Sequence, residues 1–503
     1  VIRYNLLKIA IACIYLVAIQ CTAPKEAPLS EKPNIILCMS DDQGWGDMGY
    51  NGHPVLKTPN FDKVASTALR FDRFYSASSV CSPTRASFMT GRDPNRTGCK
   101  WIGNYLRPQE ISIAEALKTA GYKTAHYGKW HIGSIRKGSP VNPGAFGFDE
   151  WLSASVQPDN DPALSREGTA VQFQGEGSMV LVDAALEFIN RQVKSSNPFL
   201  VVIWFGSPHV PHIATKQDLE LYKDIPENPT LYGYSHGLLS SHTSDRFPDL
   251  QEELKNFYGE ITAMDRAFGK LREELRTLQI HENTILWFTS DNGAIRDIGR
   301  SGGRGCKGDI YEGGVLVPGL LEWPAKIKQP TVTNIPCNII DIYPTVLDIA
   351  GVEMKNQPVL DGISLLPLLE GKMKSRPKPM GFWIYNPKDL VLGTYMHEYI
   401  KEQEEGLEPD TIKFPIYTDA AVIKKHYPED RFPGWAAWND WPWKLHRSEK
   451  ESGEIDYKLF NLIEDPLEEN DLSKIHTEHV TTMNSEMEKW QKSVLFSLNG
   501  KDY

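Results

Sequence analysis

Four short runs of apolar residues, each bounded by turn-forming residues, stand out along the chain. They cover residues 34–40, 123–127, 199–205 and 284–289, and such continuous runs are typical of strands that are buried on both faces. The last three runs each follow a segment with helical spacing of apolar residues, and these segments cover 111–120, 178–192 and 252–278. The alternation predicts an α/β fold in which helices flank a mostly parallel central sheet, with ligands beyond the carboxyl ends of its strands.

The alternation fades after residues 371–379, which are rich in proline and lysine. Aromatic residues become denser there, and an amphipathic helix is expected over residues 478–495. We therefore expect a large domain over residues 33–375 and a smaller C-terminal α+β domain with an antiparallel sheet over residues 376–503. A chain of 503 residues is long enough for two domains.

The first 21 residues are expected to be an export signal. Basic residues precede an apolar run, residues 9–19, that is too short to span a bilayer. Cys21 follows the letters VAIQ, which resemble a lipoprotein cleavage site except that Gln20 stands where a small residue is usual. The alternatives are a plain signal peptide and a lipid anchor at Cys21, each followed by a polar linker over residues 22–32. The protein is thus expected in the periplasm, secreted, or as a lipoprotein at the outer membrane or cell surface.

Composition and charge restrict the classes of function that this chain can have. Apolar residues make up 41% of the chain and charged residues 24%, which is ordinary for a globular protein. The formal net charge of -11 argues against a nucleic-acid partner and requires that any anionic substrate be attracted locally. Seven cysteines are present, without the spacing of a disulfide framework.

Acidic and amide residues follow two of the predicted strands. Asp41 and Asp42 come after the first, and Asp291 and Asn292 come after the run at 284–289. At one sheet edge, three carboxylates would repel each other unless a hard divalent cation lay between them, and oxygen ligands suit Ca²⁺ or Mg²⁺. The alternative is that both segments are ordinary turns, in which Asp, Asn and Gly are common.

A cysteine begins another segment of interest. Cys81-Ser82-Pro83-Thr84-Arg85 precedes a helical run, and proline is favoured in the first turn of a helix. Helix starts attract anions, and Arg85 would add the positive charge that makes a thiol reactive. The alternative is an inert buried cysteine.

These segments together resemble the type I sulfatases of the alkaline phosphatase superfamily. The resemblance rests on Cys81 to Arg85 followed by Thr90-Gly91-Arg92, and on eight further segments: residues 33–47, 57–60, 127–133, 207–209, 304–308, 311–314, 341–345 and 457–466. It spans nearly the whole chain and implies that residues 33–375 form a sulfatase catalytic domain.

The resemblance implies a role for each matched residue in catalysis. One Ca²⁺ would be held by four residues: Asp41, Asp42, Asp291 and Asn292. A formylglycine-generating or sulfatase-maturing enzyme would oxidise Cys81 to formylglycine (3-oxoalanine). One hydroxyl of the hydrated aldehyde would attack sulfur, and the other would expel sulfate, so the cysteine is a precursor.

Further roles follow from the same resemblance. Arg85 would stabilise the ionised hydroxyl, Lys129 and Lys307 would bind sulfate oxygens, His209 would protonate the leaving oxygen, and His131 would contact formylglycine and aid sulfate release. His212 matches no motif and is expected to be structural. Many relatives carry an arginine at the position of Leu316, so the substrate contacts that they make there do not transfer.

We therefore expect a sulfuric ester hydrolase that removes sulfate from a carbohydrate such as ulvan, carrageenan or a glycosaminoglycan. The alternatives are a phosphodiesterase or phosphonate monoester hydrolase of the same superfamily and a non-catalytic carbohydrate-binding relative.

Four tryptophans lie close together in the expected small domain: Trp435, Trp438, Trp441 and Trp443. These tryptophans either pack between the domains, or Trp438 and Trp441 line the mouth of the site and contact sugar rings.

Overall fold

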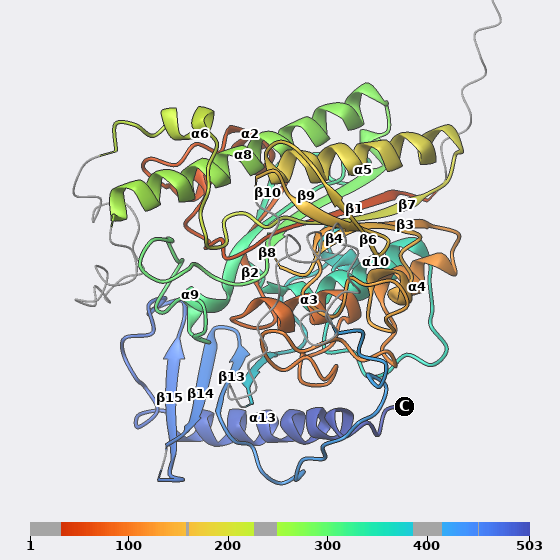
Figure 1. The fold of residues 1–503 in the computed structure, drawn as a ribbon. Coiled ribbons are helices and arrows are strands. Elements are labelled where there is room, and N and C mark those ends of the chain that lie inside the picture. Colours follow the sequence, from red (N-terminus) through yellow and green to blue (C-terminus); the bar gives the residue numbers. More distant parts are fainter. Residues whose placement is uncertain (1–31, 157–159, 226–248, 386–414, 451) are drawn as a thin grey trace, which may run out of the picture.

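The computed structural model of the protein describes the chain except for residues 1–31, 157–159, 226–248, 386–414 and 451 (Figure 1). The expected export signal and Cys21 therefore lie outside the described residues. No helix in the described part of the chain is long and apolar enough to cross a membrane.

An eleven-stranded sheet forms the centre of the large domain. Its strands are β1 (Asn34–Ser40), β2 (Leu69–Tyr75), β3 (Lys123–Lys129), β4 (Glu150–Ala154), β5 (Ala163–Arg166), β6 (Thr169–Gln172), β7 (Phe199–Trp204), β8 (Thr284–Ser290), β9 (Leu316–Glu322), β10 (Thr331–Thr333) and β11 (Cys337–Asn338). The order is β10-β2-β9-β8-β1-β7-β3-β4-β5-β6, and β11 also pairs with β2. Neighbours from β8 through β4 are parallel, whereas β9 is antiparallel to β8 and β2.

Helices cover both faces of this sheet (Figure 1). The helices are α2 (Pro59–Thr67), α3 (Cys81–Thr90), α4 (Ile113–Lys118), α5 (Gly177–Lys194), α6 (Lys216–Glu220), α8 (Leu250–Thr277), α9 (Glu312–Val315), α10 (Ile342–Ala350) and α11 (Leu366–Leu369), with short 3₁₀ turns at Gly49–Asn51, Pro143–Phe146, His281–Asn283 and Ile339–Asp341. Side chains alternate along β1, so Ile35 and Leu37 join the core under α3, α4 and α10, while Ile36 and Cys38 join the core under α2, α5 and α8. This double burial explains why the strands are continuously apolar.

The small domain is a four-stranded antiparallel sheet with one long helix. It contains β12 (Met380–Ile384), β13 (Trp435–Asp440), β14 (Trp443–Glu449), β15 (Ile455–Asn461) and α13 (Thr477–Leu498). Helix α13 crosses one face of the sheet (Figure 1), while Phe382 and Ala437 on the other face pack with Tyr75 and Leu316 of the large domain. The predicted fold class is therefore confirmed, and the boundary at residue 375 remains a prediction.

Buried arginines join α13 to the large domain. The Arg92 Nη2 and Arg96 Nη1 atoms donate to the Ser497 hydroxyl at 3.2 and 2.9 Å. Arg92 also pairs with Glu110 at 2.5 Å. The Thr90-Gly91-Arg92 part of the sequence motif thus contributes to the packing of the two domains.

Candidate active site

Strand register brings the four predicted metal ligands together. Ser40 and Ser290 are aligned at the ends of parallel strands β1 and β8, so the residues that follow them meet at one sheet edge. The Asp42 amide donates to Asp291 Oδ1 at 3.1 Å, and Asn292 Nδ2 donates to Asp42 Oδ1 at 2.8 Å. Together with Asp41, these side chains are completely buried.

The chemistry of this group fits a hard divalent cation. Asp41 Oδ1 and Asn292 Oδ1 are buried and have no hydrogen-bond partner among the described residues. Burial and the charge of Asp41 raise the pKa of Asp291 to about 7, which reflects the repulsion between crowded carboxylates. A cation bound by oxygen ligands would satisfy the free oxygens and relieve that repulsion.

Cys81 is the first residue of α3 and is buried beside the same carboxylates. Its Sγ and one carboxylate oxygen each from Asp41 and Asp291 lie within 4.8 Å of one another. Burial raises the pKa of the Cys81 thiol, and the charges of Lys129 and Lys307 do not compensate. A protonated thiol fits a precursor better than a nucleophile.

Arg85 and Lys129 contact these carboxylates from two elements. Arg85 lies one turn after Cys81 on α3, and its Nη2 lies 2.7 Å from Asp291 Oδ2 and 3.4 Å from Asp41 Oδ2. Lys129, the last residue of β3, pairs through Nζ with Asp41. Burial alone would raise the pKa of Asp41, but Lys129, His209 and Arg85 outweigh it and hold that pKa well below its usual range.

Lys307 and His209 complete the opposite side of the site. Lys307 Nζ lies 2.6 Å from Asp42 Oδ1 and 2.7 Å from Asp42 Oδ2. His209, in the loop after β7, donates from Nδ1 to the Val210 carbonyl at 2.6 Å, and its Nε2 lies 3.6 Å from Asp42 Oδ2. Because Nδ1 is engaged by that carbonyl, Nε2 is the nitrogen that faces the site. Burial lowers the pKa of His209 to about 4.

Two further histidines lie nearby and differ in their contacts. His131 follows β3, and its buried Nδ1 has no hydrogen-bond partner in the part of the chain that the structure describes. Burial, with the charge of Lys129, lowers the pKa of His131. His212 contacts Glu253 Oε1 at 2.5 Å and the Pro208 carbonyl at 3.0 Å, which supports its predicted structural role.

A second layer of buried charges, which the sequence motifs did not predict, supports the segment that carries Lys307. Glu312 Oε1 accepts from Lys444 Nζ at 2.9 Å, and its Oε2 accepts from the Tyr75 hydroxyl at 2.8 Å. Lys444 lies 3.2 Å from Glu468, which also pairs with His446 at 2.8 Å. The small domain thereby holds the chain five residues after Lys307.

Sequence patterns contained part of this second layer. Glu312 lies in a matched motif, and Glu468 lies two residues after the Asp465-Pro466 match. Their partner Lys444 is 132 residues from Glu312 in the chain, which hides the pairing from any local pattern. The only local sign of the pairing is that Lys444 stands at an inward-facing position of a strand, where a buried charge needs a partner of opposite charge.

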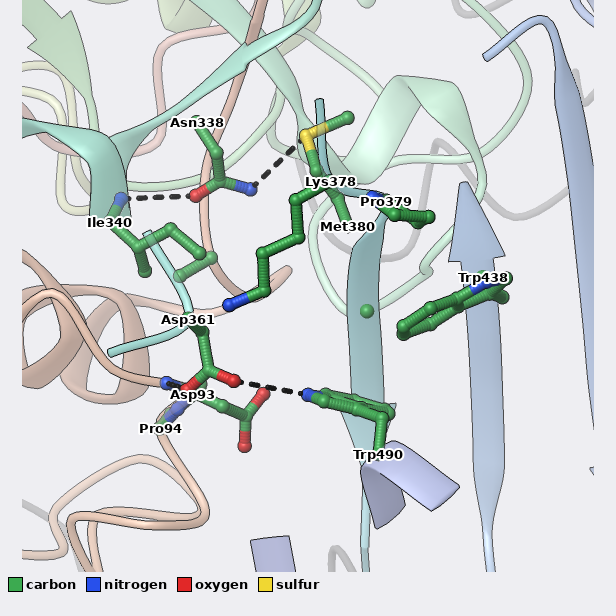
Figure 2. Close-up of a pocket in the computed structure, with 12 residues that line it drawn as sticks. Asp93, Pro94, Asn338, Ile340, Asp361, Lys378, Pro379, Met380, Trp438 and Trp490 are labelled. Carbon is green, nitrogen blue, oxygen red and sulfur yellow. Dashed lines mark hydrogen bonds between the residues drawn. The ribbon is translucent and has the colours of Figure 1, made fainter. Parts of the chain in front are cut away.

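The four tryptophans of the small domain have separate environments. Trp438 is buried with its ring 5.6 Å from that of Trp490 on α13, and both line a small cavity of about 20 Å³ (Figure 2). Trp443 packs against His479 at 4.9 Å. Trp435 lies 5.0 Å from Tyr311, and the Arg73 guanidinium lies 4.0 Å from the Trp441 ring. Trp438 therefore serves packing, whereas Trp435 and Trp441 face the large domain.

Comparisons with known proteins identify a family. A family model described as Sulfatase matches residues 33–352. The chain is 33% identical over 330 residues to the ulvan-active sulfatase of Formosa agariphila, covering 64% of this chain and 62% of that protein, which is less than two thirds of its length. It is also 33% identical over 386 residues to arylsulfatase A of Homo sapiens, covering 73% of each. The crystal structure of Ps i-CgsB in complex with k-i-k-neocarrahexaose superposes with a TM-score of 0.72 at 25% identity, covering 92% of this chain and 93% of the other.

Proposed function

The chain belongs to the sulfatase family, and we propose that it hydrolyses sulfate esters of a sulfated carbohydrate. One observation carries this proposal: four oxygen ligands, Cys81 and three cationic side chains converge at the carboxyl ends of β1, β3 and β8. One similar protein is described as an ulvan-active sulfatase, and one similar structure contains the oligosaccharide k-i-k-neocarrahexaose. Both relatives favour a carbohydrate substrate. For this chain we propose ulvan, carrageenan and glycosaminoglycans as candidate substrates.

We assign the metal and the modified residue to groups of this chain. Asp41, Asp42, Asp291 and Asn292 would hold one Ca²⁺, which supplies positive charge that polarises the sulfate ester. Formylglycine, made from Cys81 by a maturing enzyme, supplies the attacking oxygen and permits release of sulfate. Arg85, fixed by Asp291 and the Lys129 carbonyl, places a permanent positive charge beside position 81.

Lys129 and Lys307 bind the sulfate oxygens in this proposal. Their ammonium groups approach Asp41 and Asp42 from two different segments, so an anion at the site would meet positive charge on two sides. Such local charge is needed because the whole chain carries a net charge of -11. The same two groups would offset the negative charge that develops as the ester bond breaks.

The histidines hold and move protons. The Val210 carbonyl fixes the His209 ring and leaves Nε2 to exchange a proton with the leaving-group oxygen. His131, through its unpartnered Nδ1, is assigned to the hydrogen bond with the modified residue and to the release of sulfate. To protonate the leaving oxygen, His209 would carry a proton on Nε2 as well as on Nδ1, and the charges of Asp42 and Asp41 favour this imidazolium form.

Measuring sulfate release tests the proposal. Formylglycine-containing protein is incubated with oligosaccharides of ulvan, carrageenan and chondroitin sulfate, and with a matched aryl sulfate and aryl phosphate. We expect sulfate from at least one saccharide. Faster hydrolysis of the phosphate would support the phosphodiesterase or phosphonate hydrolase alternative, and no release from any substrate would support a non-catalytic carbohydrate-binding protein.

The surroundings of the enzyme are also proposed. Export, to the periplasm or out of the cell, would bring it to polymeric substrates, and lipidation of Cys21 would hold it at a membrane surface. Globomycin treatment, which blocks lipoprotein signal cleavage, tests the anchor. An unchanged mature protein would exclude lipidation.

A further inference from the structure

The loop that carries His209 lies against one face of helix α8. Asn256 Oδ1 accepts from the Ala214 amide at 3.0 Å, and the Glu260 carboxylate accepts from the Ile213 amide. The two side chains share a face of the helix because they are four positions apart. Helix α8 therefore supplies acceptors to backbone groups that lie four and five residues after His209.

A glycine inside α8 permits this close approach. A Cβ atom at Gly259 would lie 2.5 Å from the Cβ atom of Ala214, which is closer than side chains pack. Glycine is disfavoured in the interior of a helix because it loses more conformational freedom on folding than other residues. The contact with the loop gives a physical reason for its presence, and it fixes the distance between the loop and α8.

Glu253, on the same helix, holds a buried histidine of the loop. Its Oε1 lies 2.5 Å from His212 Nδ1, and His212 Nε2 lies 3.0 Å from the Pro208 carbonyl oxygen. The His212 side chain is 0% exposed and that of Glu253 is 25% exposed. The ring of Phe257 packs edge-on against His212 at 5.2 Å. His212 is thus fixed between α8 and the residue that precedes His209.

The two hydrogen bonds of His212 require a proton on each ring nitrogen. A carboxylate and a carbonyl oxygen are both acceptors, so Nδ1 and Nε2 both donate, as only the imidazolium form can. Glu253 supplies the negative charge that compensates this cation. A neutral His212 has a single N–H group and would lose one of the two hydrogen bonds.

The Pro208 carbonyl belongs to the peptide unit that joins Pro208 to His209. This unit is planar, so a hydrogen bond to its oxygen fixes the direction in which the backbone of His209 begins. The His209 ring is held further on by the Val210 carbonyl at 2.6 Å, and its Nε2 lies 3.6 Å from Asp42 Oδ2. The position of Nε2 therefore depends on the peptide that His212 holds.

We propose that Glu253 is a positioning residue for proton transfer by His209, acting through His212 and the Pro208 carbonyl. The inference rests on the proposed function and deepens it by assigning the side chains that orient the proton donor. Loss of the Glu253 charge would let the peptide before His209 turn. The cost would fall on the step in which the leaving oxygen takes its proton.

Two aryl sulfates that differ in their need for a proton test the inference. Phenyl sulfate releases a weakly acidic phenol, whereas p-nitrophenyl sulfate releases a phenolate that is stable without protonation. We expect Glu253→Gln in formylglycine-containing enzyme to lower kcat/KM about tenfold for phenyl sulfate, part of the full effect of a general acid, and less than about twofold for p-nitrophenyl sulfate. The ratio of the two values does not depend on the fraction of enzyme that is folded.

Three further variants complete the test. Glu252→Gln is the matched control, because Glu252 is the neighbouring residue of α8, is 54% exposed and lies 3.7 Å from Lys255. His212→Phe keeps an aromatic ring beside Phe257 and removes both hydrogen bonds, so it should reproduce the selective loss even if Glu253→Gln does not fold. In His209→Ala enzyme the ratio should already be changed, and Glu253→Gln should change it no further.

The outcomes separate this inference from the proposed function. Equal losses on both substrates in Glu253→Gln and His212→Phe would overturn the positioning role, as would the same selective loss in Glu252→Gln. A further selective loss when Glu253→Gln is added to His209→Ala would also overturn it, because Glu253 would then act without His209. Failure of the proposed function is read in the native matured enzyme, as absence of aryl sulfate hydrolysis, and in His209→Ala, as absence of the selective loss.

Discussion

Lys444 Nζ of strand β14 lies 2.9 Å from Glu312 Oε1, and the two side chains are 0% and 3% exposed. The contact ties the small domain to the segment that carries Lys307. Burial alone would lower the pKa of Lys444, but Glu312 and Glu468 outweigh it and raise that pKa. The lysine is therefore charged, and each partner depends on the other to compensate a buried charge.

The Lys444→Met substitution should lower both stability and turnover. Removing one member of a buried pair costs about 3–5 kcal/mol, and the freed segment would no longer hold Lys307 beside Asp42. We expect a lower melting temperature and a lower kcat/KM for an aryl sulfate, which is too small to reach the small domain. Lys450→Met is the control, since Lys450 is exposed and pairs with nearby Glu454 at 3.2 Å.

A double-mutant cycle distinguishes positioning from general destabilisation. If Lys444 acts through Lys307, Lys444→Met should reduce kcat/KM much less in the Lys307→Ala background than in the native background. Additive losses at a temperature where all variants are folded would show that Lys444 contributes stability alone.

The active protein should carry an aldehyde at position 81. Cys81 is buried, and its raised thiol pKa opposes direct attack by sulfur. Mass spectrometry of the peptide that spans position 81 should therefore find formylglycine in proportion to specific activity. Cys81→Ala should abolish turnover with an unchanged melting temperature. Full activity in protein that contains only unmodified cysteine would contradict the mechanism.

Metal removal should abolish activity and lower stability. Calcium binds the native state in this proposal, so adding it to chelator-treated protein should raise the melting temperature. Asp291→Ala should remove that calcium-dependent rise and also lower the metal-free melting temperature, because the buried Arg85 guanidinium, 2.7 Å from Asp291, would lose its main partner. Asp348→Ala, at an exposed position of α10, serves as control. Full turnover in metal-free protein would exclude the assignment.

The sequence predicted that the acidic residues of the candidate site meet at one sheet edge, because they lie within two residues of the ends of predicted strands. Asp41 directly follows the predicted strand over residues 34–40, Asp291 lies two residues after the predicted strand over residues 284–289, and parallel register brings them together. Lys444 and Glu312 could not be paired in this way, because β14 belongs to another sheet and reaches Glu312 only through domain packing. Long-range contacts of this kind depend on tertiary structure, which local periodicity does not encode.

The tryptophan-rich segment shows a similar limit. Its composition suggested either packing or sugar contact for Trp438 and Trp441 together, yet strand alternation separates neighbours on β13. Trp438 points to α13 and Trp435 to the large domain, while Trp441, in the turn after β13, contacts Arg73. One cluster in the sequence is thus divided among different environments.

Trp438→Ala should destabilise the protein without changing substrate preference. The side chain is 6% exposed and packs against Trp490, and removal of a buried tryptophan costs about 3–5 kcal/mol. The melting temperature should fall, and kcat/KM should change by the same factor for an aryl sulfate and a sulfated oligosaccharide. A loss confined to the oligosaccharide at unchanged stability would instead place Trp438 in a sugar site.

Asp93 should make the stability of the protein depend on pH. Its carboxyl lies next to Asp361 and Trp490 beside the small cavity (Figure 2). Burial and the charge of Asp361 raise the pKa of Asp93 to about 7, whereas Arg96, at 2.8 Å, helps to hold Asp361 ionised. In the unfolded chain an aspartate titrates near pH 4. The folded state therefore binds a proton more tightly, and the stability that this provides is lost as pH rises from about 4 to about 7.

Asp93→Asn isolates this effect. Asparagine resembles the protonated acid, and its Oδ1 can still accept from the Asn95 amide, as Asp93 Oδ1 does at 2.9 Å. We expect the melting temperature of the variant to exceed that of the native protein by a margin that grows between pH 5 and pH 7 and is constant above about pH 8, where Asp93 is ionised in both states. Asp348→Asn, at an exposed position of α10, is the control for the loss of one carboxylate. A margin for Asp93→Asn that does not change with pH would show that Asp93 is ionised throughout, and that Arg96 neutralises both carboxylates.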